Sequence, residues 1–511
     1  MFEASQLEPD RVSSLTPEII IQARKAQAIW ASYSFKERAL FIEKIETYLA
    51  NHVDGIAMEV SRATSKTPVD ALSAEVIPCI MACQWYRKNA EYYLKPKKLK
   101  TSSILFANKR SEIHRLPMGV VAVISPWNYP LTIPFGEVMM GLMAGNSVLL
   151  KVASNVTSIG QLIKKVIASA NLPKGLFQVL EGPGDEVSEF LFREKIDKFF
   201  FTGSVAVGKE LMRKASETLT PISLELGGND PMIVLCDADL ERASNGACWG
   251  AFQNAGQTCG GVERVYVHES IYKSFLDLLV RKTLSLRHGT DHKNLLDIGG
   301  MTTKKQFETV LNHVDEAKKQ GATVVAQSIQ VGESRGFSYP ATVITKVSHE
   351  MKIMREETFG PVVCVMPFKT TEEAISLAND SHLALTSSVW SRDHKKAYEI
   401  AQKIQAGVTC INDHLYTHAL SETPWGGWKE SGIGRTHGAQ GLEEMTHVKL
   451  INWDLLSTKR NLFWYPVEEK TYHQLRLIIQ FLHPKNPLQF LKTSCKILFF
   501  AMKKMFTPWR V

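Results

Sequence analysis

Short apolar runs that alternate with helical stretches constrain this chain's fold more than any other feature of its sequence. From residue 119 the runs GVVAVI, SVLLK, LFQVLEG and KFFFTG follow one another, and stretches with helical periodicity, such as 158–170 and 184–193, separate them. Strands that are apolar on both faces are typical of a parallel sheet, and the helices between them cover that sheet. The segment therefore predicts an α/β domain.

A second alternation of the same kind begins at residue 231. The runs PMIVL (231–235) and VERVYVH (262–268) open it, and the pattern continues to about residue 425. This segment predicts a second α/β domain.

The segments outside these two alternations have a different character. Residues 17–60 and 69–94 carry apolar side chains at helical spacing, and 99–117 alternates polar and apolar residues, which predicts an exposed hairpin. The compositional break comes near residue 455, where a basic, aromatic tail begins.

Composition and charge exclude several classes of protein. Of the 511 residues, 44% are apolar and 22% charged, which is ordinary for a globular chain of two or three domains. After Asp454 the tail holds ten Lys or Arg and two acids, whereas residues 1–454 carry 50 charges of each sign. The tail thus accounts for the whole net charge of +8. A neutral main body gives no reason to expect nucleic-acid binding.

Cysteine usage and the N-terminus indicate a cytoplasmic protein. Eight cysteines are scattered without a disulfide framework, which suits a reducing compartment. Cys79 and Cys83 are interpreted as one packed helix face, and no metal site is predicted, because no second ligand pair follows at zinc spacing. The first residues carry acids and no secretory signal, and no run of about 18 apolar residues predicts a spanning helix.

Two acidic or nucleophilic side chains stand beside glycines and are candidates for catalysis. Cys259 lies in NAGQTCGG (254–261), after a helical run, and cysteine is a strong nucleophile once its thiolate is favoured. Glu225 lies in an apolar strand that ends at two glycines, where low polarity raises a carboxyl pKa toward that of a general base. A structural cysteine and a solvated edge glutamate are the alternatives.

Two further motifs follow predicted strands. Asn128, in ISPWNYP (124–130), offers an amide donor that can stabilise an oxyanion, although Asn-Tyr-Pro is also an ordinary turn. In FFFTGSVAVGKEL (199–211), Gly203 and Gly208 bracket a helix start whose free N–H groups can bind a pyrophosphate. The spacing differs from G-x-G-x-x-G, so this pattern alone leaves nucleotide binding open.

Taken together and in this order, the motifs closely resemble those of the aldehyde dehydrogenase superfamily. The resemblance covers about residues 15–453, and Glu225 and Cys259 stand 34 residues apart, as it requires. The motifs that carry it are PWNYP (126–130), KVAS (151–154), FTGS followed by Gly208, LELGG (224–228), GQTC (256–259), EETFGP (356–361) and PWGGWKESGIGR (424–435).

The resemblance implies a thioester mechanism that uses NAD or NADP. Cys259 would attack the aldehyde, the Asn128 side chain and the Cys259 N–H would hold the oxyanion, and Glu225 would activate the hydrolytic water. It also implies a set of residues that contact the cofactor: Trp127, Lys151, Ser154, Gly203, Ser204, Gly208, Leu226, Glu357 and Phe359.

One position bears on the choice between the two cofactors. Strongly NAD-selective members that resemble this chain carry a glutamate three residues after the lysine, where Ser154 stands here. A carboxylate there would repel a 2′-phosphate, whereas a hydroxyl beside Lys151 can donate to one. Under this interpretation we expect the chain to accept NADP as well as NAD.

The resemblance further implies a Rossmann-like dinucleotide-binding domain, an α/β catalytic domain and a β arm for oligomerisation. Strands that project from the body leave unpaired edges unless another subunit covers them, so we expect a homodimer or homotetramer. The expected ranges are 1–98 with 118–228 for dinucleotide binding, 229–425 for catalysis, 99–117 with 426–454 for the arm, and 455–511 for a basic amphipathic extension.

Three alternatives stay open at this stage. A CoA-acylating aldehyde dehydrogenase would release the thioester to a thiol, but Glu225 favours release to water. A non-catalytic protein of the same fold is disfavoured by the intact Cys259, Glu225 and Asn128. We expect an apolar or aromatic aldehyde as the substrate, and a semialdehyde such as succinate semialdehyde is the alternative, although no arginine cluster near the motifs indicates one.

The tail contains two amphipathic helical patterns, which Pro484 and Pro487 interrupt. Their composition suits the surface of an anionic membrane, with a contact through 471–506, and packing on the body or on another subunit is the alternative. The first apolar stripe is Tyr472, Leu475, Ile478, Ile479 and Leu482; the second is Leu488, Leu491, Cys495, Leu498, Phe499, Met502 and Phe506, with Lys492, Lys496 and Lys503 along its flank and Phe490, Ile497 and Phe500 elsewhere.

Overall fold

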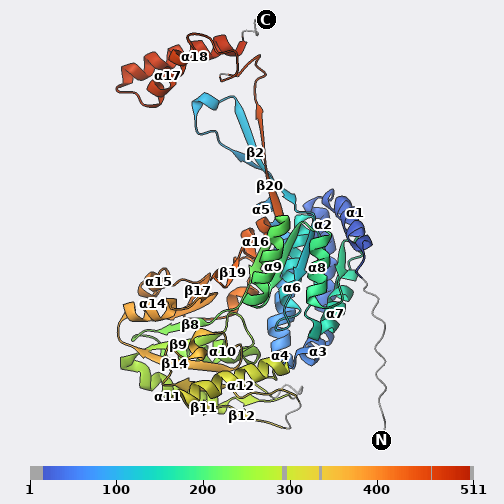
Figure 1. Ribbon diagram of the computed structural model, residues 1–511, viewed down its shortest axis with the longest axis vertical. Coiled ribbons are helices and arrows are strands. Elements are labelled where there is room, and N and C mark those ends of the chain that lie inside the picture. Colours follow the sequence, from blue (N-terminus) through green and yellow to red (C-terminus); the bar gives the residue numbers. More distant parts are fainter. Residues whose placement is uncertain (1–14, 291–295, 333–335, 462, 507–511) are drawn as a thin grey trace. The chain divides into compact units, whose positions relative to one another are not determined.

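A computed structural model describes residues 15–290, 296–332, 336–461 and 463–506 (Figure 1). The chain divides into two compact units. The first comprises residues up to Lys95 together with Arg115–Val448, and the second comprises Pro96–His114 and the chain from Lys449 onward.

Helices open the first unit. The Ser34 side chain and Glu37 form a capping box that starts the second helix. The Trp30 indole donates to the Leu142 carbonyl at 2.7 Å, which ties the first helix to α6 (Thr132–Ala144). The helices are α1 (Pro17–Ala31), α2 (Phe35–Asn51), α3 (Val53–Thr64), α4 (Pro68–Ala71) and α5 (Ile77–Leu94), with a π-helical turn at Leu72–Val76. Cys79 and Cys83 are both buried on α5, in agreement with a packed helix face.

The first alternation forms a six-stranded sheet in the order β19-β7-β6-β3-β4-β5. Every pair is parallel except β19 with β7, and helices α1, α6, α7 and α9 contact its strands, as predicted. Its elements are β3 (Val120–Ile124), α6 (Thr132–Ala144), β4 (Ser147–Lys151), α7 (Thr157–Ala168), β5 (Phe177–Val179), α8 (Gly184–Arg193), β6 (Lys198–Thr202), α9 (Val205–Thr218), β7 (Ile222–Glu225) and β19 (Gly432–Ile433).

The second alternation forms a seven-stranded sheet in the order β11-β13-β14-β9-β8-β16-β17, in which only β11 is antiparallel to its neighbour. Its strands are β8 (Asp230–Val234), β9 (Val262–His268), β11 (Thr323–Gln327), β13 (Thr342–Thr345), β14 (Val362–Phe368), β16 (Thr386–Trp390) and β17 (Val408–Ile411). Its helices are α10 (Leu240–Phe252), α11 (Glu269–Ser285), α12 (Lys304–Lys319), α13 (Lys352–Arg355), α14 (Thr371–Asn379) and α15 (His394–Ala401).

The chain passes from one sheet to the other through a short, glycine-containing link. Strand β7 ends at Glu225, Gly227 and Gly228 follow, and β8 begins at Asp230. A Cβ atom at position 228 would lie 2.3 Å from the Cys259 carbonyl oxygen, so only glycine permits the loop before β9 to approach this closely. The link therefore brings the end of β7 next to Cys259.

The second unit contains the predicted hairpin and the tail. Strands β1 (Lys97–Leu99), β2 (Lys109–Pro117) and β20 (Thr446–Asp454) form a sheet in that order, which confirms the pairing of the hairpin with the strand near 447–453. We expected the arm to resume at residue 426, but 426–448 belongs to the first unit. The reason is that β19 pairs with β7, and Leu442 in α16 (Gly438–Glu444) and Met445 after it are buried in the first unit's core.

Two helices, α17 (Thr471–Leu482) and α18 (Pro487–Phe506), complete the second unit and pack on each other. Ile478, Ile497 and Phe500 are buried between them, and Leu105 packs against this cluster. The second predicted stripe therefore does not face the helix partner: Leu488, Leu491, Leu498, Phe499 and Met502 are exposed. In the described part of the chain, no helix is long and apolar enough to cross a membrane.

Candidate active site

Cys259 follows a turn with an unusual backbone. Asn254, Ala255 and Gly256 all have positive φ values, of 54°, 53° and 66°. The Asn254 side chain holds this conformation by donating to the Asn128 carbonyl at 3.0 Å and to the Gln257 carbonyl at 3.1 Å. Such strain is retained where surrounding contacts enforce it, which is common at functional sites. The NAGQTC segment thus presents Cys259 at a defined place.

The Cys259 thiol is held in its neutral form by its surroundings. Its side chain is partly buried, and burial raises the pKa of the thiol well above its ordinary value. The nearby carboxyl groups of Glu357, Asp230 and Glu225 raise this pKa further, whereas a hydrogen bond with the Gly260 backbone lowers it. The thiol therefore needs a proton acceptor, or a change of environment on ligand binding, before it can attack.

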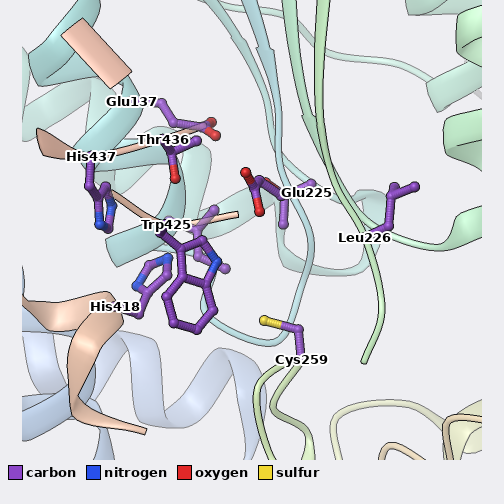
Figure 2. Close-up of a pocket in the computed structure, with 10 residues that line it drawn as sticks. Glu137, Glu225, Leu226, Cys259, His418, Trp425, Thr436 and His437 are labelled. Carbon is purple, nitrogen blue, oxygen red and sulfur yellow. The ribbon is translucent and has the colours of Figure 1, made fainter. Parts of the chain in front are cut away.

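Glu225 lies at the end of β7 with its carboxyl group directed into the cavity that also contains Cys259 (Figure 2). Neither carboxyl oxygen has a hydrogen-bond partner among the described residues. Burial is the main reason why its pKa lies well above the ordinary value, and the Glu137 carboxylate raises it further, whereas Arg435 lowers it. The direction of this shift agrees with the expectation that the apolar surroundings of Glu225 raise its pKa.

Asn128 is fixed from both its backbone and its side chain. Its carbonyl accepts a hydrogen bond from the buried Lys66 ammonium at 2.9 Å, and its side-chain amide donates to the Gln257 carbonyl at 3.1 Å. Lys66 forms an ion pair with Glu75, which is also buried and accepts from the Leu131 and Thr132 N–H groups at 3.0 and 2.9 Å. A buried ion pair therefore anchors the turn that carries the predicted oxyanion donor.

One cavity of about 540 Å³ opens at the N-terminus of α9 and is called the α9 cavity below. Trp127, Lys151, Ser154, Gly203 and Ser204 line it, and the Ser204 side chain caps α9 by accepting from the Val207 N–H at 3.4 Å. The remaining free N–H groups of the helix and the Lys151 ammonium make this end suitable for a phosphate group. The Lys151 ammonium lies 3.5 Å from the Ser154 hydroxyl, as a shared contact with a ligand would require.

A second cavity, of about 210 Å³, shares Trp127, Gly203 and Ser204 with the α9 cavity and is called the Glu357 cavity. Asn128, Glu225, Leu226, Cys259, Glu357 and Phe359 also line it.

Aromatic and carboxyl groups shape the Glu357 cavity. The Trp127 and Phe359 rings meet edge to face at 5.6 Å, and Glu357 accepts from the Gly228 N–H at 2.9 Å. A Cβ atom at position 227 would lie 2.3 Å from a Glu357 carboxyl oxygen, so Gly227 is needed for this carboxyl group to lie where it does. The two cavities thus run from Lys151 to Cys259.

Gly208 is the one predicted cofactor residue that lines neither cavity. It is buried in α9, where a Cβ atom would lie 2.6 Å from a Leu226 methyl group. The sequence predicted that Gly208 contacts the cofactor. The packing observed here supports a structural role, in which Gly208 allows α9 to approach the end of β7 closely.

A third cavity reaches Cys259 and is called the apolar cavity. It measures about 240 Å³, and no Lys, Arg, Asp or Glu occurs in its lining. Tyr129, Ile133, Trp249, Tyr416 and Trp425 provide most of its aromatic and aliphatic surface. Burial lowers the pKa of the lining residue His418 to about 4, so this side chain adds no positive charge at neutral pH.

Several residues at the site were not predicted from the sequence. Glu137, His418 and His437 line the cavity beyond Glu225, and Lys66 and Glu75 anchor Asn128 (Figure 2). For Glu137 a signal existed, because it is the one charged residue in α6, whose thirteen residues are all buried. For Lys66 and Glu75 we find none, since Lys66 lies in an ordinary polar stretch between two predicted helical segments and Glu75 lies in the second of them.

Comparison with known proteins agrees with this arrangement of a cysteine, a buried glutamate and a nucleotide-sized cavity. The sequence pattern of the aldehyde dehydrogenase family matches residues 12–451. The chain is 36% identical to 4,4′-diapolycopene aldehyde oxidase from Methylomonas sp over 477 residues, which cover 93% of this chain and 88% of that one. It is 35% identical to a putative succinate-semialdehyde dehydrogenase [NADP(+)] from Mycolicibacterium smegmatis, over 84% of this chain and 83% of the relative.

Solved structures of aldehyde dehydrogenases have the same fold as this chain. An aldehyde dehydrogenase from Bacillus cereus in complex with NAD⁺ is 33% identical and superposes with a TM-score of 0.81, over 86% of this chain and 88% of that one. The chain belongs to the aldehyde dehydrogenase family. It is an NAD(P)-dependent oxidoreductase that converts an aldehyde into a carboxylic acid.

Proposed function

We propose that this enzyme oxidises an apolar aldehyde at Cys259, with Asn128 as the oxyanion donor and Glu225 as the base. The observation that carries the proposal is that Cys259 lines both the apolar cavity and the Glu357 cavity. A substrate in the first and a cofactor in the second would thus meet at one sulfur atom. Glu225 lines the Glu357 cavity as well, which brings the base to the same place.

The residues that line the α9 cavity and the Glu357 cavity fit NAD(P). Lys151 and the N-terminus of α9 would hold its phosphates, Glu357 its nicotinamide-side ribose, and Trp127 and Phe359 would enclose the ring. When bound, NAD(P) supplies the hydride acceptor. Ser154 beside Lys151 leaves room and a hydroxyl donor for a 2′-phosphate, so we infer that NADP is accepted.

The chain's own residues supply the rest of the chemistry. The Cys259 sulfur forms a bond to the aldehyde carbon, and the thiol proton leaves to a base. The Asn128 amide, now bonded to the Gln257 carbonyl, stabilises the negative oxygen of the thiohemiacetal. Loss of hydride leaves a thioester on Cys259. Glu225 then takes a proton from water, whose oxygen bonds to the acyl carbon while the C–S bond breaks and the acid leaves.

Two substitutions test these roles separately. Cys259→Ala should abolish turnover but leave cofactor binding near the wild-type level, because the covalent route is removed. Glu225→Gln should give a burst of about one NAD(P)H per site followed by slow turnover, because hydrolysis is affected after hydride transfer. Activity of Cys259→Ala would contradict the nucleophile, and equal slowing of both phases would show that Glu225 also deprotonates the thiol.

The apolar cavity supports the proposed substrate class. A semialdehyde carries a carboxylate, whose burial is costly without a cation, and the lining of this cavity contains none. The relative named 4,4′-diapolycopene aldehyde oxidase favours an apolar substrate, whereas the relative named as a putative succinate-semialdehyde dehydrogenase favours a semialdehyde. A panel of aldehydes followed by NAD(P)H absorbance decides the matter: we expect kcat/KM for decanal or benzaldehyde to exceed that for succinate semialdehyde at least tenfold.

Glu225 also bears on the acceptor of the acyl group. A buried glutamate directed at the cavity beside Cys259 supports release to water. Turnover that requires CoA would contradict this and favour an acylating enzyme.

We further propose that the enzyme forms a homodimer or homotetramer through its arm. Strand β20 is an edge strand of its sheet, and Leu450, Ile451 and Trp453 are exposed along it. An exposed apolar edge strand is a template for pairing with another chain. Light scattering should show an oligomer that Leu450→Lys/Trp453→Lys dissociates, and a monomeric wild-type enzyme would contradict the proposal.

We also propose that the tail brings this cytoplasmic enzyme to an anionic membrane surface. All eight cysteines are free, which supports a reducing compartment. On α18, Leu491, Leu498 and Phe499 are 61%, 62% and 73% exposed, and Lys492 and Lys496 are exposed beside them. Apolar side chains can enter the lipid boundary while each nearby cation adds about 1 kcal/mol of attraction to anionic headgroups.

Vesicle binding by the full-length enzyme tests this second role. Wild type should bind phosphatidylserine-containing vesicles at low salt, and Leu491→Glu/Phe499→Glu should bind at least tenfold more weakly. Leu219→Glu is the matched control, because Leu219 is 87% exposed but lies in the first unit. Absence of binding by wild type at low salt would rule out the membrane role and leave contact with another subunit as the function of this surface.

A further inference from the structure

A second buried carboxyl group faces the predicted base. Glu137 lies in α6 and is 2% exposed, and its carboxyl group points into the same cavity as that of Glu225 (Figure 2). Among the described residues, one Glu137 carboxyl oxygen and both oxygens of Glu225 lack a hydrogen-bond partner. The mechanism above gives Glu137 no role, although a buried charge without a partner is costly.

The other groups around this cavity do not neutralise two carboxylates. Arg435 lowers the pKa of Glu225, and Glu444 raises it. His418 and His437 also line the cavity, but burial lowers the pKa of each imidazole, so both stay neutral near pH 7. The Cys259 thiol is neutral as well, as described above.

Two carboxyl groups in one cavity of low polarity cannot ionise independently. The first ionisation makes the second harder, and the protons leave in steps that belong to the pair. Burial raises the pKa of Glu137 to about 8, against the lowering by the Thr202 hydroxyl. Glu225 is affected more, because its burial and the charge on Glu137 act in the same direction.

We propose that Glu137 and Glu225 form a coupled carboxyl pair, in which Glu137 is the positioning residue that sets the pH at which Glu225 becomes available as the base. This inference rests on the proposed role of Glu225 in hydrolysis. While the pair holds one negative charge, the proton lies on either carboxyl group, and water is activated only when Glu137 carries it. Glu225 is fully available only after the second proton has left.

Glu137→Gln tests the pairing, because glutamine has nearly the same shape and cannot ionise. Rapid mixing with a good aldehyde substrate separates the burst from the later hydrolysis of the thioester, which is measured from pH 5 to pH 10. Without the competing carboxylate, the Glu137→Gln rate should rise in one step, about one pH unit below the final rise of wild type. Hydrolysis below the wild-type midpoint should then be up to about tenfold faster. Glu137→Asp, which keeps the charge, should retain the wild-type profile.

A stability measurement gives a second readout that does not depend on turnover. A carboxyl group whose folded pKa is raised contributes stability below its unfolded pKa and loses it as the pH rises toward the folded value. The unfolding free energy of wild type should therefore fall, relative to Glu137→Gln, between about pH 4.5 and pH 8.

The hydrolysis rates of the two glutamine variants distinguish a failure of the proposed Glu225 base from a failure of the proposed carboxyl pair. If Glu225→Gln hydrolyses the thioester like wild type, the role of Glu225 itself fails. If Glu225→Gln is slow, but Glu137→Gln leaves the pH profile in place or lowers the rate equally at every pH, then Glu137 is only a packing residue and the coupled pair is refuted.

Discussion

Lys66→Met is expected to destabilise the enzyme strongly, because it removes one half of a buried ion pair. The Lys66 and Glu75 side chains are 1% and 0% exposed, and their charged atoms lie 2.5 Å apart. Removing one partner of such a pair typically costs about 3–5 kcal/mol, because the other charge stays buried. The lost hydrogen bond from Lys66 to the Asn128 carbonyl adds about 1 kcal/mol. Methionine retains the apolar stem, so the packing change is small.

Urea unfolding of wild type, Lys66→Met, Glu75→Gln and the double variant measures this effect as a thermodynamic cycle. We expect Lys66→Met to lose about 4–6 kcal/mol, and the double variant to lose less than the sum of the single variants by about 1–3 kcal/mol. The acylation rate should fall as well, because the turn that carries Asn128 loses its anchor. A loss below about 1 kcal/mol, or strictly additive losses, would refute the argument that the pair holds this turn.

Three further substitutions have defined outcomes. Asn128→Ala should lower the rate of hydride transfer by about 10²–10³ without weakening cofactor binding, and an unchanged single-turnover burst would contradict its role as oxyanion donor. Ser154→Glu should shift the ratio of kcat/KM from NADP toward NAD by about fivefold or more, because a carboxylate beside the 2′-phosphate costs at least about 1 kcal/mol; an unchanged ratio would show that this position does not determine the choice. Gly227→Ala should raise the cofactor Kd measured by fluorescence titration, because its Cβ atom would displace Glu357, and a wild-type Kd would place the ribose contact elsewhere.

The sheets were predictable, because strands that are apolar on both faces and short helices between them produce a distinct local pattern. The runs at 119–124 and 198–203 became the neighbouring strands β3 and β6, and the hairpin at 99–117 found its partner in β20. The resemblance of the motifs to those of aldehyde dehydrogenases then indicated Cys259 and most of the residues that line the cofactor cavities.

Other features depend on contacts that no local pattern contains. On α18, apolar residues occur on both sides of the helix, so periodicity did not show that Ile497 and Phe500, rather than Leu498 and Phe499, would face α17. The packing of Gly208 against Leu226 was hidden for a similar reason, because it depends on the approach of two elements that are separate in the sequence. Glu137 was visible as a lone charge in an apolar helix, but Glu225, which lines the same cavity, lies on strand β7, far away in the sequence.

The protonated state of Cys259 has a consequence for the lifetime of the enzyme in the cell. Oxidants such as peroxide react with thiolates and scarcely with thiols, so a cysteine that keeps its proton escapes conversion to sulfenic acid while the enzyme is idle. Burial and three nearby carboxyl groups maintain that state. The same surroundings that delay attack on the aldehyde therefore also protect the nucleophile from the first step of oxidation between one substrate and the next.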